Sequence, residues 1–208
     1  MVKVWVADVS PLCESGCYEA YYSALPDFRK KKADALRSVE MRAQSAGVWS
    51  LWEKIRKEYG IADDAPRNFS HSGQYVMCAV ETAGKNAAVG CDLEKKGELK
   101  LRLAKRFFCP EEYEMILDQD SEEKRTDMFY RYWVLKESFM KATGKGMALP
   151  VNSFCIRLGE PPVLVRQSAE FTEDYYYMEY EWMGIPYKMA VCSTDARIDT
   201  ALHTELKL

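Results

Sequence analysis

The stretch AAVGCDLE, residues 87–94, sets a short apolar run in front of two acidic side chains. The run predicts a β-strand, in which Asp92 and Glu94 point to one face with Cα atoms about 7 Å apart. Neighbouring carboxylates repel each other, so one takes up a proton unless a cation neutralises the pair. The pattern therefore indicates a site for a divalent metal ion.

A second stretch, WVLKESFMKATGKG at residues 133–146, offers complementary chemistry on a predicted helix. Lys136, Glu137 and Lys141 fall within about one and a half turns, and Glu137 and Lys141 share a face because they are four residues apart. Three carboxylates with lysines suit a phosphate-bearing substrate handled with Mg²⁺. Taken separately, the same residues are also typical of a solvated strand end and an exposed helix ion pair.

The composition is that of a globular protein with a sizeable core. The chain has 208 residues, of which 48% are hydrophobic, and a net charge of −3, whereas nucleic-acid binding needs a broad basic surface. The sequence has no run of about 18 apolar residues, the length that a membrane helix needs. Lys3 and Asp8 interrupt the N-terminal segment where the apolar region of a secretory signal would lie. We expect a cytoplasmic protein of one domain or two small ones, with no nucleic-acid or membrane partner.

The seven cysteines are an odd number and lie mostly within apolar segments. This distribution is typical of reduced, buried thiols. Cys13 and Cys17 resemble half of a zinc site, but the sequence has no second Cys or His pair to complete it. We expect no structural zinc there.

The order of predicted elements is β–α–α–β–β and then α–α–α–β–β–β, an α+β plan used twice. Residues 75–81 and 87–94 read as a hairpin joined near residues 84–86. The last strands are predicted in FCIRL, PVLVR, YYYMEYEWM and YKMAVCS. We divide the chain into an N-terminal half, residues 1–86, and a C-terminal half, residues 87–208, that carries the metal motif.

Two polar segments precede the metal motif. NFSHSG at residues 68–73 gathers two hydroxyls and an imidazole at a strand entrance, which favours a phosphate-binding turn. A Ser–His nucleophile is the alternative, although adjacent residues rarely reach that geometry. The basic run Arg29 to Lys32, taken alone, is typical of a solvated helix face.

In this order and spacing, NFSHSG, VGCDLE and WVLKESFMKATGKG resemble the signature of the Sfp-type 4′-phosphopantetheinyl transferases, (V/I)G(V/I)D…(F/W)xxKEaxxK; the similarity covers about residues 68–194. The resemblance implies transfer of the phosphopantetheine arm of coenzyme A to a serine of an apo acyl or peptidyl carrier protein, with release of 3′,5′-ADP. It also implies a monomer built as a pseudodimer of two similar α+β halves, each with helices packed on a small antiparallel sheet.

The resemblance assigns roles to individual residues. Asp92, Glu94 and Glu137 are the expected Mg²⁺ ligands. Lys141 is expected to neutralise pyrophosphate charge, and Glu137 is the leading candidate for the base that takes the serine proton. The expected coenzyme A contacts are Lys31, Arg29, Ser70, His71, Ser72, Asp92, Lys136 and Lys141.

The sequence departs from the family pattern at two places. Cys91 stands where the signature usually carries Val or Ile, and the loop at residues 60–68 lacks the Lys-Pro element found in many relatives, for which Arg67 is a candidate substitute. Two other functions stay open at this point. One is a Mg²⁺-dependent phosphohydrolase acting on nucleotides, and the other is a non-catalytic module that binds coenzyme A or a carrier.

Overall fold

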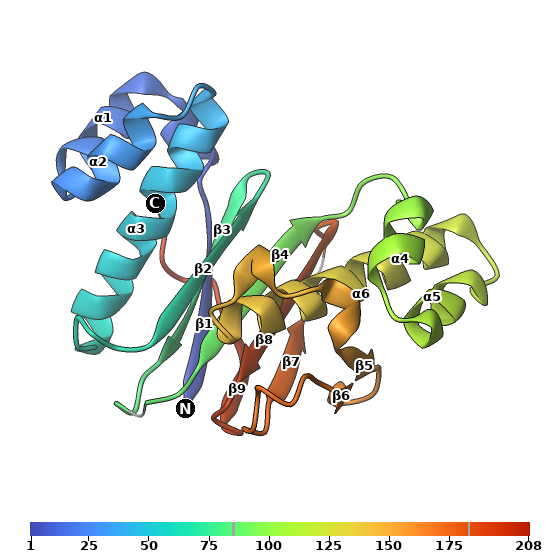
Figure 1. Cartoon of the computed structure of the whole chain (residues 1–208). Helices are drawn as coiled ribbons and strands as arrows, with labels where there is room; N and C mark the ends of the chain where they lie inside the picture. Colours follow the sequence, from blue (N-terminus) through green and yellow to red (C-terminus); the bar gives the residue numbers. More distant parts are fainter. Residues whose placement is uncertain (85, 183) are drawn as a thin grey trace.

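Two β-sheets packed face to face form the centre of the molecule, and a long helix covers the outer face of each sheet (Figure 1). This computed structural model describes residues 1–84, 86–182 and 184–208. The predicted α+β class is confirmed. None of the helices in the described ranges is both long and apolar enough to cross a bilayer.

The first sheet has the strand order β2-β3-β1-β9 and is antiparallel except for β9, which runs parallel to β1. Its strands are β1 (Val2–Asp8), β2 (Arg67–Ser72), β3 (Tyr75–Glu81) and β9 (Ile198–His203). The helices of this part are the 3₁₀ turn η1 (Ser10–Cys13), α1 (Ser15–Ser23), α2 (Asp27–Asp34) and α3 (Val39–Tyr59). The predicted strands did not include β9, whose residues are half-buried or exposed at the sheet edge and lack a continuous apolar face.

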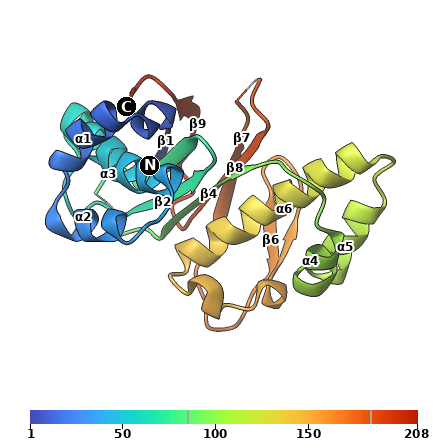
Figure 2. The ribbon, with the colours of Figure 1, turned by 90° about the horizontal axis from the view of Figure 1, so that it is seen from above.

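The second sheet has the order β4-β8-β7-β6-β5 with antiparallel neighbours. Its strands are β4 (Val89–Lys95), β5 (Cys155–Arg157), β6 (Val163–Arg166), β7 (Tyr176–Tyr180) and β8 (Tyr187–Ser193). The helices are α4 (Leu101–Phe107), α5 (Pro110–Leu117), α6 (Glu122–Ala142) and the 3₁₀ turns η2 (Gly146–Ala148) and η3 (Val151–Ser153). Seen from above, α1 and α2 lie at one end of the molecule and α4 and α5 at the other (Figure 2).

The alternation of side chains along the strands explains the layers. Val2, Val4 and Val6 of β1 face the second sheet, whereas Trp5 and Ala7 pack beneath α3. In the second sheet, the face opposite the interface packs against Leu135 and Phe139 of α6. Each sheet is therefore buried on both faces over its central strands, which accounts for the high apolar content of these strands.

The predicted hairpin between residues 75–81 and 87–94 is wrong. β3 pairs with β1 and β2, while β4 pairs with β8 in the other sheet. All seven residues of β3 are buried, so this strand needs a covering layer on both faces, and β4 supplies part of that layer by stacking. The hairpin that does form joins β2 to β3 through Gly73, whose φ of 52° suits a tight turn. Lys85, within the connection that we predicted, lies outside the described residues.

Where the two sheets meet, β2 is joined to β4 by side chains instead of a backbone ladder. Asn68 Oδ1 accepts from the backbone N–H of Cys91 at 3.2 Å, and Ser70 Oγ accepts from that of Leu93 at 3.2 Å. Ser72 Oγ accepts from the N–H of Lys95 at 3.1 Å. The side chains of alternate β2 residues thus accept hydrogen bonds from the backbone N–H groups of alternate β4 residues. These bonds fix the register between the two sheets.

Gly90 lets β4 approach α6 without a spacer. A methyl group at this position would overlap the carbonyl oxygen of Ser138 and the backbone nitrogen of Ala142. Gly90, Asp92 and Glu94 alternate along β4, so the close approach also sets the distance between the two acidic residues and α6.

We predict that Gly90→Ala lowers the free energy of unfolding by about 1–3 kcal/mol, since the atoms that the methyl group meets are backbone atoms that cannot rotate away. Urea unfolding measures this change. Gly16→Ala is the matched control, because an added methyl meets nothing within 4 Å there. Equal stability of the two variants would contradict the close contact.

Candidate active site

Three elements bring most of the predicted site residues together at the junction of the two sheets. β4 contributes Asp92 and Glu94, and the neighbouring β2 contributes a serine to each of them. Ser70 Oγ donates to Asp92 Oδ1 at 2.9 Å, and Ser72 Oγ donates to Glu94 Oε2 at 2.9 Å. Asp92 is buried, so the solvated strand end considered from the sequence is not what forms.

Lys141 reaches this cluster from α6. Its Nζ donates to Asp92 Oδ1 at 2.8 Å, to the carbonyl oxygen of Cys91 at 3.0 Å and to Ser70 Oγ at 3.1 Å. Burial by itself lowers the pKa of Lys141, but Asp92, Cys91 and Glu137 together outweigh it and the net pKa is raised. The ammonium group is therefore charged at neutral pH and held in place.

The site carries more negative charge than Lys141 neutralises. Burial, followed by repulsion from Asp92, raises the pKa of both Glu94 and Glu137. Three carboxylates against one ammonium leave an excess of two negative charges when all are ionised. Partial burial and mutual repulsion both disfavour that state in the protein alone.

The donor set fits a divalent cation. Asp92 Oδ2 is buried, and no hydrogen-bond donor of the described residues reaches it. Within the described ranges, the oxygens of Asp92, Glu94 and Glu137 do not gather to within 4.8 Å of one another. Carboxylate oxygens are the ligands that hold Mg²⁺ in proteins, and the two charges of Mg²⁺ would balance the two excess negative charges of the site.

A group of cations borders the site on the side of α2. His71 is exposed on β2, and partial desolvation together with the charges of Lys141 and Lys32 lowers the pKa of its imidazole. The positive charges around His71 favour an anionic ligand at this place. The sequence prediction did not single out Lys32; its one available signal was the run Arg29 to Lys32. Lys31, which we predicted, is exposed on α2.

Arg29 is tied to α3. The side chain is buried, donates from Nη2 to the carbonyl oxygen of Ser45 at 2.5 Å, and lies with Cζ 5.6 Å from the ring centroid of Trp49. Burial lowers its pKa. Its charge contributes to the lowered pKa of His71, so Arg29 acts on the site through its field, and a direct ligand contact stays a prediction.

The cofactor contact predicted for Lys136 is wrong. Lys136 points to the opposite side of α6, where its Nζ lies 2.9 Å from Glu112 Oε2, and both side chains are 1% exposed. The same Nζ donates to the carbonyl oxygens of Val151 and Phe154 at 2.9 Å. Successive helix residues differ by about 100° in direction, so Lys136 and Glu137 face different surroundings.

Comparison with known proteins places the segments that form this site within a known family. A family model described as "4'-phosphopantetheinyl transferase superfamily" matches residues 88–192, which contain β4 and α6. 4′-phosphopantetheinyl transferase Sfp of Bacillus subtilis (strain 168) is 41% identical over 142 residues, covering 66% of this chain and 61% of the relative. 4′-phosphopantetheinyl transferase gsp of Aneurinibacillus migulanus is 30% identical over 156 residues, covering 74% and 63%. This chain thus spans about three fifths of the length of these relatives.

Among solved structures, holo-[acyl-carrier-protein] synthase of Thermotoga maritima is similar with a TM-score of 0.43 and 18% identity. The match covers 51% of this chain and 61% of that protein.

We predict that Lys136→Met lowers the free energy of unfolding by about 3–5 kcal/mol, because it leaves Glu112 buried without its cation. Lys124→Met, which breaks the exposed pair with Asp120, is the control and changes stability by less than about 1 kcal/mol. Denaturant unfolding distinguishes the two. Weaker coenzyme A binding by Lys136→Met at unchanged stability would restore the cofactor role.

We predict that Glu137→Gln stabilises the metal-free protein by about 0.5–2 kcal/mol at neutral pH, since it removes a carboxylate that folding disfavours. A carboxyl whose pKa is raised by folding opposes folding while ionised. The gain is therefore largest above the raised pKa and vanishes as pH falls toward 4.5, the ordinary value. Thermal unfolding of both proteins with a chelator, from pH 7.5 to 4.5, measures it; a constant difference across that range would contradict the raised pKa of Glu137.

Proposed function

Because this chain belongs to the 4′-phosphopantetheinyl transferase superfamily and is of the Sfp type, we propose that it transfers the 4′-phosphopantetheine arm of coenzyme A to a serine of an apo acyl or peptidyl carrier protein. The observation that carries the proposal is the buried Asp92, held by Lys141 and Ser70, with one oxygen that no donor of the described residues reaches. The charges of Asp92 and Lys141 both act on the pKa values of Glu94 and Glu137, so the three acidic groups and the ammonium share one electrostatic environment.

The proposed reaction is a displacement at phosphorus. The carrier serine oxygen forms a bond to the phosphorus that bears the pantetheine arm. The bond from that phosphorus to the bridging pyrophosphate oxygen breaks, and 3′,5′-ADP leaves with the electron pair. Most of the acceleration in such reactions comes from positioning and charge neutralisation.

The residues of the site have distinct parts in this proposal. Asp92, Glu94 and Glu137 would hold Mg²⁺, which supplies neutralisation of the pyrophosphate charge when bound. Lys141 places its ammonium against the charge that develops on the leaving oxygen. Glu137 takes the serine proton, and its raised pKa brings it nearer to the range in which a general base works at neutral pH.

His71 and the cations around it would receive the phosphates of coenzyme A that lie outside the reacting bond. The imidazole stands next to Ser70 in β2 and shares the field of Lys141, Lys32 and Arg29. Ser70 and Ser72 hold Asp92 and Glu94 with their hydroxyl protons, so we assign them to positioning the carboxylates. Lys31 stays a proposed contact on the exposed side of α2.

We further propose that the two halves, divided at residues 86 and 87, form a pseudodimer. In each half the first strand pairs antiparallel with a later strand, β1 with β3 and β4 with β8. Each half also has a helix of 21 residues, α3 or α6, on the outer face of its sheet. A monomeric state and a cytoplasmic location belong to the proposal and rest on the sequence.

We expect the purified protein, with coenzyme A and Mg²⁺, to add one phosphopantetheinyl group to an apo carrier protein, detected by intact mass. Asp92→Asn is expected to lower the rate at least about a hundredfold, because the buried oxygen pair loses its charge. Asp174→Asn, at an exposed aspartate, is the matched control with an unchanged rate.

The same assay without a carrier separates the competing functions. Release of 3′,5′-ADP from coenzyme A in the absence of any carrier would indicate a phosphohydrolase. Binding of coenzyme A without release or transfer, tested over several acyl and peptidyl carriers, would indicate a binding module. Either result contradicts the transferase proposal.

A further inference from the structure

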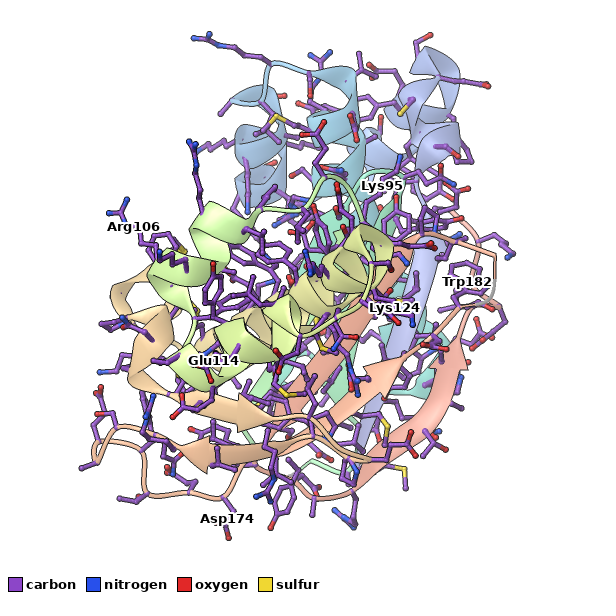
Figure 3. All side chains as sticks on the ribbon, turned by 90° about the vertical axis from the view of Figure 1, so that its right-hand side faces the viewer. Lys95, Arg106, Glu114, Lys124, Asp174 and Trp182 are labelled. Atoms are coloured by element: carbon purple, nitrogen blue, oxygen red, sulfur yellow. The ribbon has the colours of Figure 1, made fainter. Side chains whose placement is uncertain are left out.

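A second set of ligand atoms converges on the side of α6 away from the proposed active site. Cys109 precedes α5, Glu111 lies in its first turn, and Cys155 begins β5. The two Sγ atoms and a carboxylate oxygen of Glu111 all lie within 4.8 Å of one another. Figure 3 views the molecule from this side, with Arg106 and Glu114 labelled on α4 and α5.

We propose that Cys109, Cys155 and Glu111 bind a thiophilic divalent cation of the Zn²⁺ class. Thiolate sulfur and carboxylate oxygen are both ligands of Zn²⁺ in proteins, and Zn²⁺ prefers four ligands in a tetrahedron. Metal–ligand bonds of about 2.0–2.3 Å place tetrahedral ligand atoms roughly 3.3–3.8 Å apart. The observed convergence therefore needs side-chain adjustments of the order of 1 Å or less.

The two segments that carry the cysteines are already fixed to each other. Glu112 Oε2 accepts from the backbone N–H of Cys109 at 2.9 Å, and Glu112 Oε1 accepts from that of Ile156 at 2.8 Å. Lys136 neutralises this buried carboxylate. One side chain thus braces the start of α5 against β5, so the two cysteines are placed before any cation arrives and only the exposed Glu111 has to be ordered on binding.

Burial raises the pKa of the Cys109 thiol and raises that of Cys155 to about 12, so both are protonated in the metal-free protein, and Arg166 is the group placed to stabilise a metal-bound thiolate at Cys109. Arg166 Nη2 donates to Cys109 Sγ at 3.0 Å, and the thiol donates to the carbonyl oxygen of Phe154 at 2.9 Å. On binding, both thiols release their protons to solvent, and the S–H bond to Phe154 is replaced by the bond to the metal. The arginine donor persists as an outer partner of the sulfur. Two thiolates, one carboxylate, a divalent cation and Arg166 then sum to zero charge.

The site has an open side. A cavity of about 620 Å³ is bordered by Glu111, Cys155 and Arg166. Solvent or a small anionic ligand can therefore occupy the fourth position of a tetrahedral cation. The carboxylates of the proposed active site favour a hard cation such as Mg²⁺, so the two sites differ in the metals that they select.

The test uses the reduced, full chain, stripped of metal and kept in excess Mg²⁺ so that hard-cation sites are filled. Titration with Co²⁺ is expected to give a sulfur-to-cobalt charge-transfer band that saturates at one equivalent and disappears when Zn²⁺ is added. Native mass spectrometry checks the stoichiometry. Zn²⁺ at about a hundred times its Kd is expected to raise Tm by roughly 5 °C or more.

Variants assign the ligands. Cys109→Ser with Cys155→Ser removes the charge-transfer band, whereas the control Cys13→Ser with Cys17→Ser keeps it. Arg166→Gln weakens Co²⁺ binding about 10–100-fold, as expected for an outer partner. The proposal is overturned if the protein does not take up one equivalent of metal, or if the band survives the loss of Cys109 and Cys155. It is also overturned if Cys109 and Cys155 are found joined in a disulfide and the protein binds no metal after that disulfide is reduced. None of these measurements depends on transfer activity.

Discussion

The hydroxyl groups of Ser70 and Ser72 are the constraint from which the geometry of the active site follows. Each oxygen accepts from a backbone N–H of β4, and each hydroxyl proton goes to a carboxylate of the same strand. A serine hydroxyl has one proton and two lone pairs, so both tasks are met at once. The contacts that hold the two sheets in register thereby also hold Asp92 and Glu94.

This arrangement concentrates charge that the fold alone does not balance. α6 approaches β4 across Gly90 so closely that Glu137 comes into the field of Asp92 and Glu94. Burial first, and then the repulsion from Asp92, raises the pKa values of Glu94 and Glu137. A site of this kind lowers the stability of the metal-free protein. The same unbalanced charge increases the affinity for a cation and, with it, for an anionic substrate. Burial of the apolar strands on both sides of the junction supplies the stability that offsets it.

Periodicity predicted most helices and strands, as well as the shared faces of Asp92 with Glu94 and Glu137 with Lys141. It failed where pairing between distant segments decides the outcome. β3 and β4 are neighbours in sequence and both apolar, which suits a hairpin and two stacked sheets equally well. The dual role of Ser70 was not predicted, although the alternation of Asn68, Ser70 and Ser72 signals a polar edge that needs a partner.

The ion pairs of Lys136 and Lys141 differ in whether all their polar groups find hydrogen-bond partners. The spacing of these residues in the sequence does not show this difference. Lys136 is 1% exposed, and its ammonium contacts Glu112 and two carbonyl oxygens. Both carboxylate oxygens of Glu112 also accept from backbone N–H groups. Lys141 is 26% exposed, and its partner Asp92 keeps one buried oxygen that no donor in the described ranges reaches. A buried pair with every group satisfied serves the fold. A pair with an unsatisfied oxygen has capacity for a ligand, and α6 therefore carries structure on one face and chemistry on the other.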